Sequence, residues 1–152
     1  MKKIIYSLVF VVAITNTGVS QISNFIDKGT QCIYFRSNNY IVTFCDTLQN
    51  KYTKSDTVNF SSEIFIKDNN IYFVYSDGSI ANYVLDKASY KVVNKDEKSD
   101  QYSWFALDEN GIKCLYTYLG DKVNKKVRLY FEYPNMIFRL EISFIDTKYK
   151  IK

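Results

Sequence analysis

The chain of 152 residues contains no histidine. Histidine is the side chain whose ordinary pKa lies nearest to neutral pH, so its absence removes the usual general base. It also removes every Ser-His or Cys-His nucleophile pair and the commonest catalytic zinc shells. The sequence therefore favours a protein without enzymatic activity.

Proline and glycine are scarce, with one and five copies, which excludes collagen-like and Pro/Gly-rich disordered chains. No glycine-rich phosphate loop is present, and we predict no cofactor. The loop with the most oxygen ligands for a metal offers Asp96, Glu97 and Asp100, but Lys95 and Lys98 lie among them. We therefore predict no metal site.

A strong excess of one charge is also lacking. The chain has 20 Lys and Arg against 16 Asp and Glu, a net charge of +4. A surface that binds nucleic acid needs clustered Lys and Arg, and no such stripe is present. Nucleic acid is therefore not a predicted partner.

The first twenty residues have the three-part pattern of a signal peptide. Lys2 and Lys3 precede an apolar run over residues 4–14, and a small-residue exit carries Gly18 and Ser20. The run is too short to cross a bilayer, which needs about 20 residues, so we predict no stable membrane span. Cleavage after Ser20 would leave residues 21–152 as one exported domain, periplasmic or extracellular.

The strongest structural pattern lies in residues 126–145, which read as two strands joined by Tyr133-Pro134-Asn135-Met136. This turn predicts three apolar cross-strand pairs on one face: Val127 with Ile142, Leu129 with Leu140, and Phe131 with Phe138. The other face pairs Arg128 with Glu141, Tyr130 with Arg139, and Glu132 with Ile137. One face should lie on a core, and the ion pairs on the other are unlike the lipid-facing surface of a membrane barrel.

A second hairpin is predicted over residues 31–36 and 40–46, with a turn at Asn38-Asn39. In that register Cys32 lies opposite Cys45, close enough for a disulfide. Cys114 is then left over, either as a small buried strand residue or as a reactive thiol.

The remaining strands follow from short apolar runs between turn signals. They are predicted at residues 51–54, 62–67, 70–76, 79–85, 89–94, 101–107, 112–119 and 148–152. A turn at Asp77-Gly78 sets Tyr72 opposite Tyr83. Residues 21–28 could form a short helix.

These patterns predict an all-β fold, an antiparallel meander of about ten strands in one domain. Such a meander most simply closes into an up-and-down barrel, which removes exposed edges, and a two-sheet sandwich is the alternative. In general shape this resembles the lipocalins and calycins, although the chain lacks a Gly-x-Trp motif at its first strand. Its only tryptophan is Trp104.

Aromatic side chains carry the functional prediction, since the chain has fourteen Tyr and eleven Phe. Rings on central strands can line a cavity for a small apolar or sugar-like ligand. The predicted site residues are Tyr72, Tyr75, Tyr83, Trp104, Tyr116 and Tyr118. The alternative is a cell-envelope or extracellular module that docks a protein partner through a sheet face or edge. Glu63, Glu132 and Glu141 are interpreted as solvated strand residues rather than a catalytic pair.

Overall fold

The computed structural model describes residues 29–46 and 51–151, and ten strands account for most of them. The predicted signal peptide and the helix expected over residues 21–28 lie outside the described residues. One short 3-10 turn, η1 (Lys87–Ser89), interrupts the strands, and no helix in the described part has the length and apolarity needed to cross a membrane. The strands are β1 (Gln31–Asp46), β2 (Lys51–Val58), β3 (Ser62–Lys67), β4 (Asn70–Tyr75), β5 (Ile80–Leu85), β6 (Lys91–Lys95), β7 (Ser99–Leu107), β8 (Lys113–Asp121), β9 (Lys126–Glu132) and β10 (Met136–Lys150).

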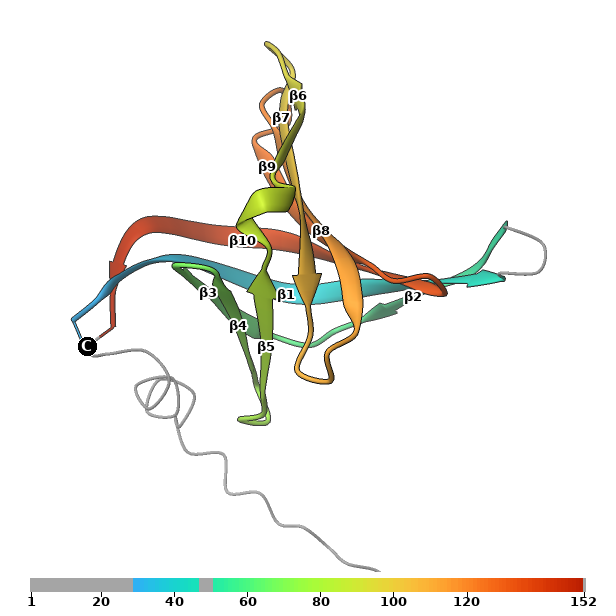
Figure 1. Cartoon of the computed structure of the whole chain (residues 1–152), viewed down its shortest axis with the longest axis horizontal. Coiled ribbons are helices and arrows are strands. Elements are labelled where there is room, and N and C mark those ends of the chain that lie inside the picture. Colours follow the sequence, from blue (N-terminus) through green and yellow to red (C-terminus); the bar gives the residue numbers. More distant parts are fainter. Residues whose placement is uncertain (1–28, 47–50, 152) are drawn as a thin grey trace, which may run out of the picture.

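Eight of these strands form a closed antiparallel barrel in the order β1, β3, β4, β5, β7, β8, β9, β10, with β10 returning to β1. This confirms the predicted all-β barrel and not the sandwich alternative. The meander is interrupted twice, because β2 and β6 lie outside the ring. β1 is long enough for two partners on one edge, with β3 beside residues 33–37 and β2 beside residues 40–46. Figure 1 shows β1 and β10 crossing the whole width of the molecule.

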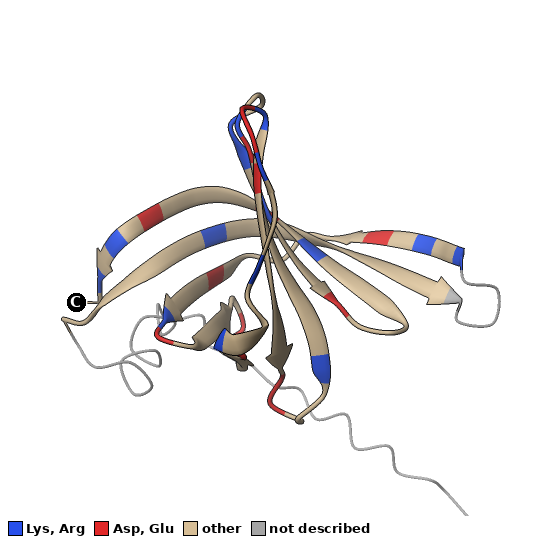
Figure 2. Ribbon diagram, turned by 45° about the horizontal axis from the view of Figure 1, so that its top comes forward, with Lys and Arg blue, Asp and Glu red and all other residues tan. Residues whose placement is uncertain are grey.

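An arm projects from the barrel where the β6–β7 and β8–β9 hairpins continue beyond it (Figure 1). Charges of both signs alternate near the tip of this arm (Figure 2). Lys122 joins the two hairpins, because its Nζ lies 2.8 Å from Asp100 Oδ1 and donates to the carbonyl of Asp96 at 2.7 Å. Because the arm extends β7 and β8 beyond the barrel, these two strands border one of the barrel's ends.

The hairpin of β9 and β10 has the predicted register at every pair, from Val127 with Ile142 to Glu132 with Ile137. The Tyr133 amide donates to the Met136 carbonyl at 2.8 Å and closes the turn. On the polar face, Arg128 Nε lies 3.0 Å from Glu141 Oε1. On the core face, Leu129, Phe131 and Leu140 are buried, whereas Phe138 is only half-buried.

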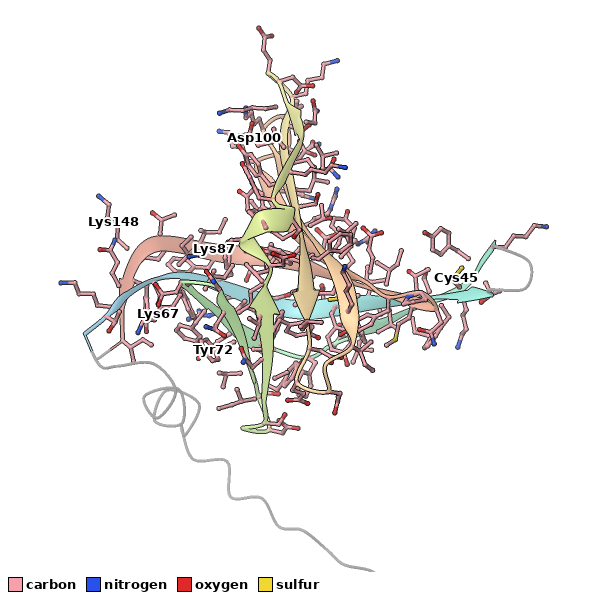
Figure 3. The ribbon with its side chains drawn as sticks, in the orientation of Figure 1. Cys45, Lys67, Tyr72, Lys87, Asp100 and Lys148 are labelled. Carbon is pink, nitrogen blue, oxygen red and sulfur yellow. The ribbon has the colours of Figure 1, made fainter. Side chains whose placement is uncertain are left out.

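The predicted first hairpin and its disulfide are wrong. Residues 31–46 form a single strand, in which Cys32 pairs with Tyr149 and Cys45 with Tyr52. All three cysteines, each within the described residues, are free. Cys32 and Cys45 lie thirteen positions apart on one extended strand, about 40 Å at roughly 3.3 Å per residue. Figure 3 shows Cys45 near the far end of β1.

The polar residues 37–39, read as a turn, instead form an irregularity where β1 changes partners. The pairing of β1 with β10 shifts register on both sides of Ser37. The buried Ser37 hydroxyl lies 2.6 Å from the Asn39 carbonyl and 2.9 Å from the Glu141 carbonyl. A bulge of this kind bends a long strand around a barrel without reversing it, and its local sequence resembles that of a turn.

The Asp77-Gly78 hairpin forms, but its register differs by one residue from the prediction. Ile71 pairs with Tyr83, and Tyr72 pairs with Asn82. The loop has three residues rather than two: Tyr75 N donates to Ser79 O at 2.9 Å, and Gly78 takes a positive φ of 84°. Because strand side chains alternate, this shift puts Tyr72 and Tyr83 on opposite faces of the sheet.

Apolar side chains pack on both sides of the barrel wall. The interior cluster contains Phe35, Ile64, Ile71, Phe73, Ala106, Cys114, Tyr116, Leu129, Phe131 and Leu140. An outer cluster covers β1, β3 and β4 and contains Cys32, Tyr34, Phe65, Val74 and Ile151, with Tyr72, Ile80 and Tyr149 against it. In the outer cluster the Tyr34 ring stacks on Tyr149 at 4.6 Å, and its hydroxyl donates to Glu63 Oε1 at 2.7 Å. Burial, and then the bond to Glu63, raises the pKa of Tyr34 to about 12.

Replacing Phe131 with Ala should lower the free energy of unfolding by about 3–5 kcal/mol, because the ring is fully buried in the interior cluster. Phe138→Ala should cost less, since this ring keeps part of its surface exposed. Tyr52→Ala, at an aromatic ring that is 65% exposed on β2, serves as the control and should change stability by less than about 0.5 kcal/mol. Denaturant melts of the three variants measure this, and equal losses for Phe131 and Tyr52 would contradict the assigned inner face.

Thiol labelling of the folded protein should find three free thiols with unequal reactivity. Cys45 is half-exposed and should react first. Cys114 should react last, because burial raises the pKa of its thiol to about 11 and leaves little thiolate at neutral pH. Mass spectrometry after timed alkylation gives the order, and a Cys32–Cys45 bridge would refute the continuous strand β1.

Candidate functional site

Two cavities lie at opposite ends of the barrel, and the interior cluster separates them. We call the larger the seam cavity, because it adjoins the short pairing of β5 with β7; its volume is about 450 Å³. We call the smaller the turn cavity, because it lies beside the β4–β5 and β9–β10 turns; its volume is about 260 Å³. The seam cavity is lined by Ile33, Phe35, Ile66, Asp68, Asn69, Leu85, Lys87, Asp100, Tyr102, Trp104, Tyr116, Tyr118, Ile145 and Thr147.

One wall of the seam cavity is a panel of four aromatic rings on β7 and β8. Cross-strand pairing sets Tyr102 opposite Tyr118 and Trp104 opposite Tyr116. The paired ring centroids lie 6.1 Å and 5.6 Å apart, and the planes of each pair are inclined by 33–34°. Outside the barrel, the exposed ring of Tyr90 lies 5.0 Å from Trp104 and extends the panel. These rings present a broad, nearly continuous π surface.

Aliphatic and phenyl groups form the facing wall, from Ile33, Phe35, Ile66 and Leu85 on the other strands of the ring. Besides the tyrosine hydroxyls, the polar lining groups are Asp68, Asn69, Lys87, Asp100 and Thr147, of which Asp68 and Asn69 lie at the turn between β3 and β4. There the side-chain oxygen of Asn69 is buried and has no hydrogen-bond partner among the described residues.

The seam beside this cavity is short. β5 and β7 share only the pairs Val84 with Leu107 and Leu85 with Ala106, followed by a bond from Asp86 N to Phe105 O at 2.9 Å. Beyond this point the chain leaves the barrel through η1, where Lys87 lies, while β7 continues toward Asp100 in the arm (Figure 3). The rest of this edge of β7 is covered, because Phe105 N donates to the Ser89 hydroxyl at 2.7 Å and residues 100–103 pair with β6.

The turn cavity holds two more of the predicted site residues, Tyr75 and Tyr83. It is lined by Tyr40, Phe60, Phe73, Tyr75, Asp77, Ser79, Tyr83, Phe131, Phe138 and Leu140. Burial raises the pKa of both tyrosines, so both are neutral phenols at neutral pH. Behind them, the Tyr133 hydroxyl donates to Asp108 Oδ2 at 3.1 Å and lies 3.3 Å from the Tyr83 hydroxyl.

The structure thus divides the six predicted site residues among three places. Trp104, Tyr116 and Tyr118 line the seam cavity, and Tyr75 and Tyr83 line the turn cavity. Tyr72 lines neither, because it lies on the outer face of β4 against the outer cluster. Sequence reasoning missed Tyr102, although its spacing of two residues from Trp104 along a strand was a signal that both face the same side.

The carboxylates considered for catalysis do not form a pair. Glu63 accepts the Tyr34 hydroxyl, and Glu141 lies between Arg128 and Arg139. Glu132 is half-buried, and this burial raises the pKa of its carboxyl group. In the described part of the chain, no three Cys, Asp or Glu side chains gather in a way that could hold a metal ion.

A comparison of the chain with protein-family models and with curated proteins finds no match. The function is therefore inferred from the shape and chemistry of the cavities.

Proposed function

We propose that this chain is an exported, non-enzymatic binding protein that holds a small apolar or sugar-like ligand in the seam cavity. The observation that supports this most directly is the cavity itself, about 450 Å³ with Trp104 and three tyrosines on one wall. Volumes of about 300–1,000 Å³ are typical of small-molecule sites. A packed barrel would instead have filled this end with side chains.

The lining favours a ligand with a flat or aliphatic body over a fully hydroxylated sugar. Rings and aliphatic groups surround most of the space, and they gain free energy by covering apolar surface. The polar groups at the rim, Asn69, Lys87 and Asp100, can orient one polar end of the ligand.

Titration with the neutral fluorophore N-phenyl-1-naphthylamine tests the proposal directly. Trp104 is the only tryptophan in the chain and lines the seam cavity, so its emission responds to a dye bound there. We expect saturable quenching of Trp104 with energy transfer to the dye, at one dye per protein. Tyr118→Ala should weaken binding by about tenfold, because one stacked ring is lost.

A matched control is Tyr52→Ala, which removes an exposed tyrosine of β2 outside the ring of the barrel and should leave the titration unchanged. Leu85→Trp adds bulk to the cavity wall beside the seam, and because it brings a second tryptophan, its dye binding is read by exciting the dye directly. It should abolish dye binding while the protein stays folded by circular dichroism. Dye binding that survives this filling of the cavity, or no saturable quenching of Trp104 in the unchanged sequence, would overturn the proposal.

Export is part of the proposal and is supported by the pattern of residues 1–20. N-terminal sequencing of the protein recovered outside the cytoplasm of its source should begin at Gln21, because the small residues Gly18 and Ser20 match the recognition pattern of signal peptidases. Recovery with Met1 intact would show that this segment is retained.

Docking to another protein is the second candidate function, and an exposed patch on the outside of the seam favours it. Val84, Phe105, Leu107 and Ile112 are 42–52% exposed, and a groove runs between the first three. Contiguous exposed apolar surface of this kind is typical of interaction sites. This patch faces away from the seam cavity, so docking becomes the preferred function if the dye titration shows no binding.

A further inference from the structure

A belt of six aromatic rings lines the turn cavity. The centroid of Tyr40 lies 6.2 Å from Phe138 and 6.4 Å from Phe60, and Phe60 lies 5.5 Å from Tyr75. Phe73 continues the belt, 6.2 Å from Tyr75 and 5.2 Å from Phe131. Phe131 and Phe138 are direct cross-strand partners, so the two ends of the belt lie on adjacent positions of β9 and β10. Four of these rings are only half-buried, so they keep surface that a ligand can cover.

Negative charge borders this cavity. Asp77 lies on its lining, held ionised because bonds from the side chain and amide of Ser79 lower the pKa of its carboxyl group. The adjoining groove carries Asp108 and Glu109 at the β7–β8 turn, which is red in Figure 2. Burial is the main cause of the raised pKa of Tyr75, and both Glu109 and Asp77 raise it further.

No lysine or arginine lines the turn cavity or the adjoining groove among the described residues. Lys113 is the lysine nearest in sequence to Asp108 and Glu109. Its ammonium lies 3.8 Å from the centroid of the Phe105 ring, which belongs to the exposed patch on the outside of the seam. The chain as a whole has a net charge of +4, so an acidic mouth runs against its overall composition. The seam cavity differs, because its rim includes Lys87.

We propose that the turn cavity is a second ligand site, specific for a small organic cation with an alkylated ammonium head. A quaternary ammonium group has no N–H to satisfy and sheds its water at low cost, so aromatic faces attract it both as a cation and as an apolar body. The carboxylates at the mouth add long-range attraction. A volume of about 260 Å³ suits such a head group better than a large ligand.

This site is independent of the seam cavity. Buried members of the interior cluster, among them Ile64 and Ile71, fill the barrel between the two ends. The two cavities share no lining residue. Occupation of one end therefore needs no change at the other, and each site can be tested alone.

Titration calorimetry with choline, set against its neutral isostere 3,3-dimethylbutan-1-ol, tests the charge requirement. The two probes have nearly the same shape, so a site that acts only through apolar contact would bind them equally. We expect choline to bind one per protein and about tenfold more tightly than the alcohol. Its affinity should also fall as sodium chloride is raised, because salt screens the acidic mouth.

Two variants locate the site. Phe60→Leu removes one ring of the belt in the loop before β3 while keeping apolar bulk, and it should weaken choline binding by about five- to tenfold. Asp77→Asn removes an exposed charge and should weaken it by about two- to threefold. Asp56→Asn, at an exposed carboxylate of β2 that pairs with Lys54, is the matched charge control and should have no effect.

Trp104→Leu separates this site from the proposed function, because it alters the seam cavity and should leave choline binding unchanged. Loss of choline binding in that variant would place the cation in the seam cavity and overturn the proposal. Equal affinity for choline and the neutral alcohol, unchanged binding by Phe60→Leu, or no saturable heat with choline would each overturn it as well.

Discussion

The pairing of β1 with β10 is the constraint on which the rest of the molecule depends. It joins the two ends of an eight-strand sheet and runs from Gln31 with Lys150 to Phe44 with Met136. Without it, the sheet would expose two edges and its inner face would lose its enclosure. Three register shifts along this pairing bend the strands, so that a strand of sixteen residues can follow the curved wall.

Closure assigns every residue to the inside or the outside, and this assignment explains how the aromatic side chains are divided. On β4, Ile71, Phe73 and Tyr75 face inward, while Tyr72 and Val74 join the outer cluster. Because both faces of β3 and β4 are covered, these strands read as nearly continuous apolar runs. The outer cluster also holds the segment that follows β10, because Ile151 is buried in it. The Ile151 carbonyl accepts a hydrogen bond from Gly29 N at 2.8 Å.

The two ends of the barrel differ in chemistry because different connections border them. The seam end has an incomplete strand pairing and a rim with both signs of charge. The turn end is bordered by turns that carry Asp77, Asp108 and Glu109, and turns favour aspartate because its side chain accepts bonds from nearby amides, as Asp77 and Asp108 do. The acidic mouth of the turn cavity is thus partly a consequence of turn chemistry. Together with the aromatic belt beneath it, this negative charge suits an organic cation.

The sequence alone determined most of the strands, the all-β class and the register of the hairpin around Pro134, because each depends on local alternation and on a turn with a defined geometry. It also showed that aromatic residues dominate the central strands. It did not show that the strand predicted over residues 148–152 is the end of β10. Only the tertiary structure decided that residues 31–46 form one strand, because a bulge and a turn use the same polar residues, and the choice depends on distant partners in β3 and β10. It alone separated Tyr72 from Tyr83 and brought Tyr102 beside Trp104 and Tyr118, because one residue of loop length reverses the face of a strand. The positions of the two cavities, at opposite ends of the barrel, likewise depend on barrel closure. Closure pairs residues more than a hundred positions apart, and such pairing cannot be read from local sequence.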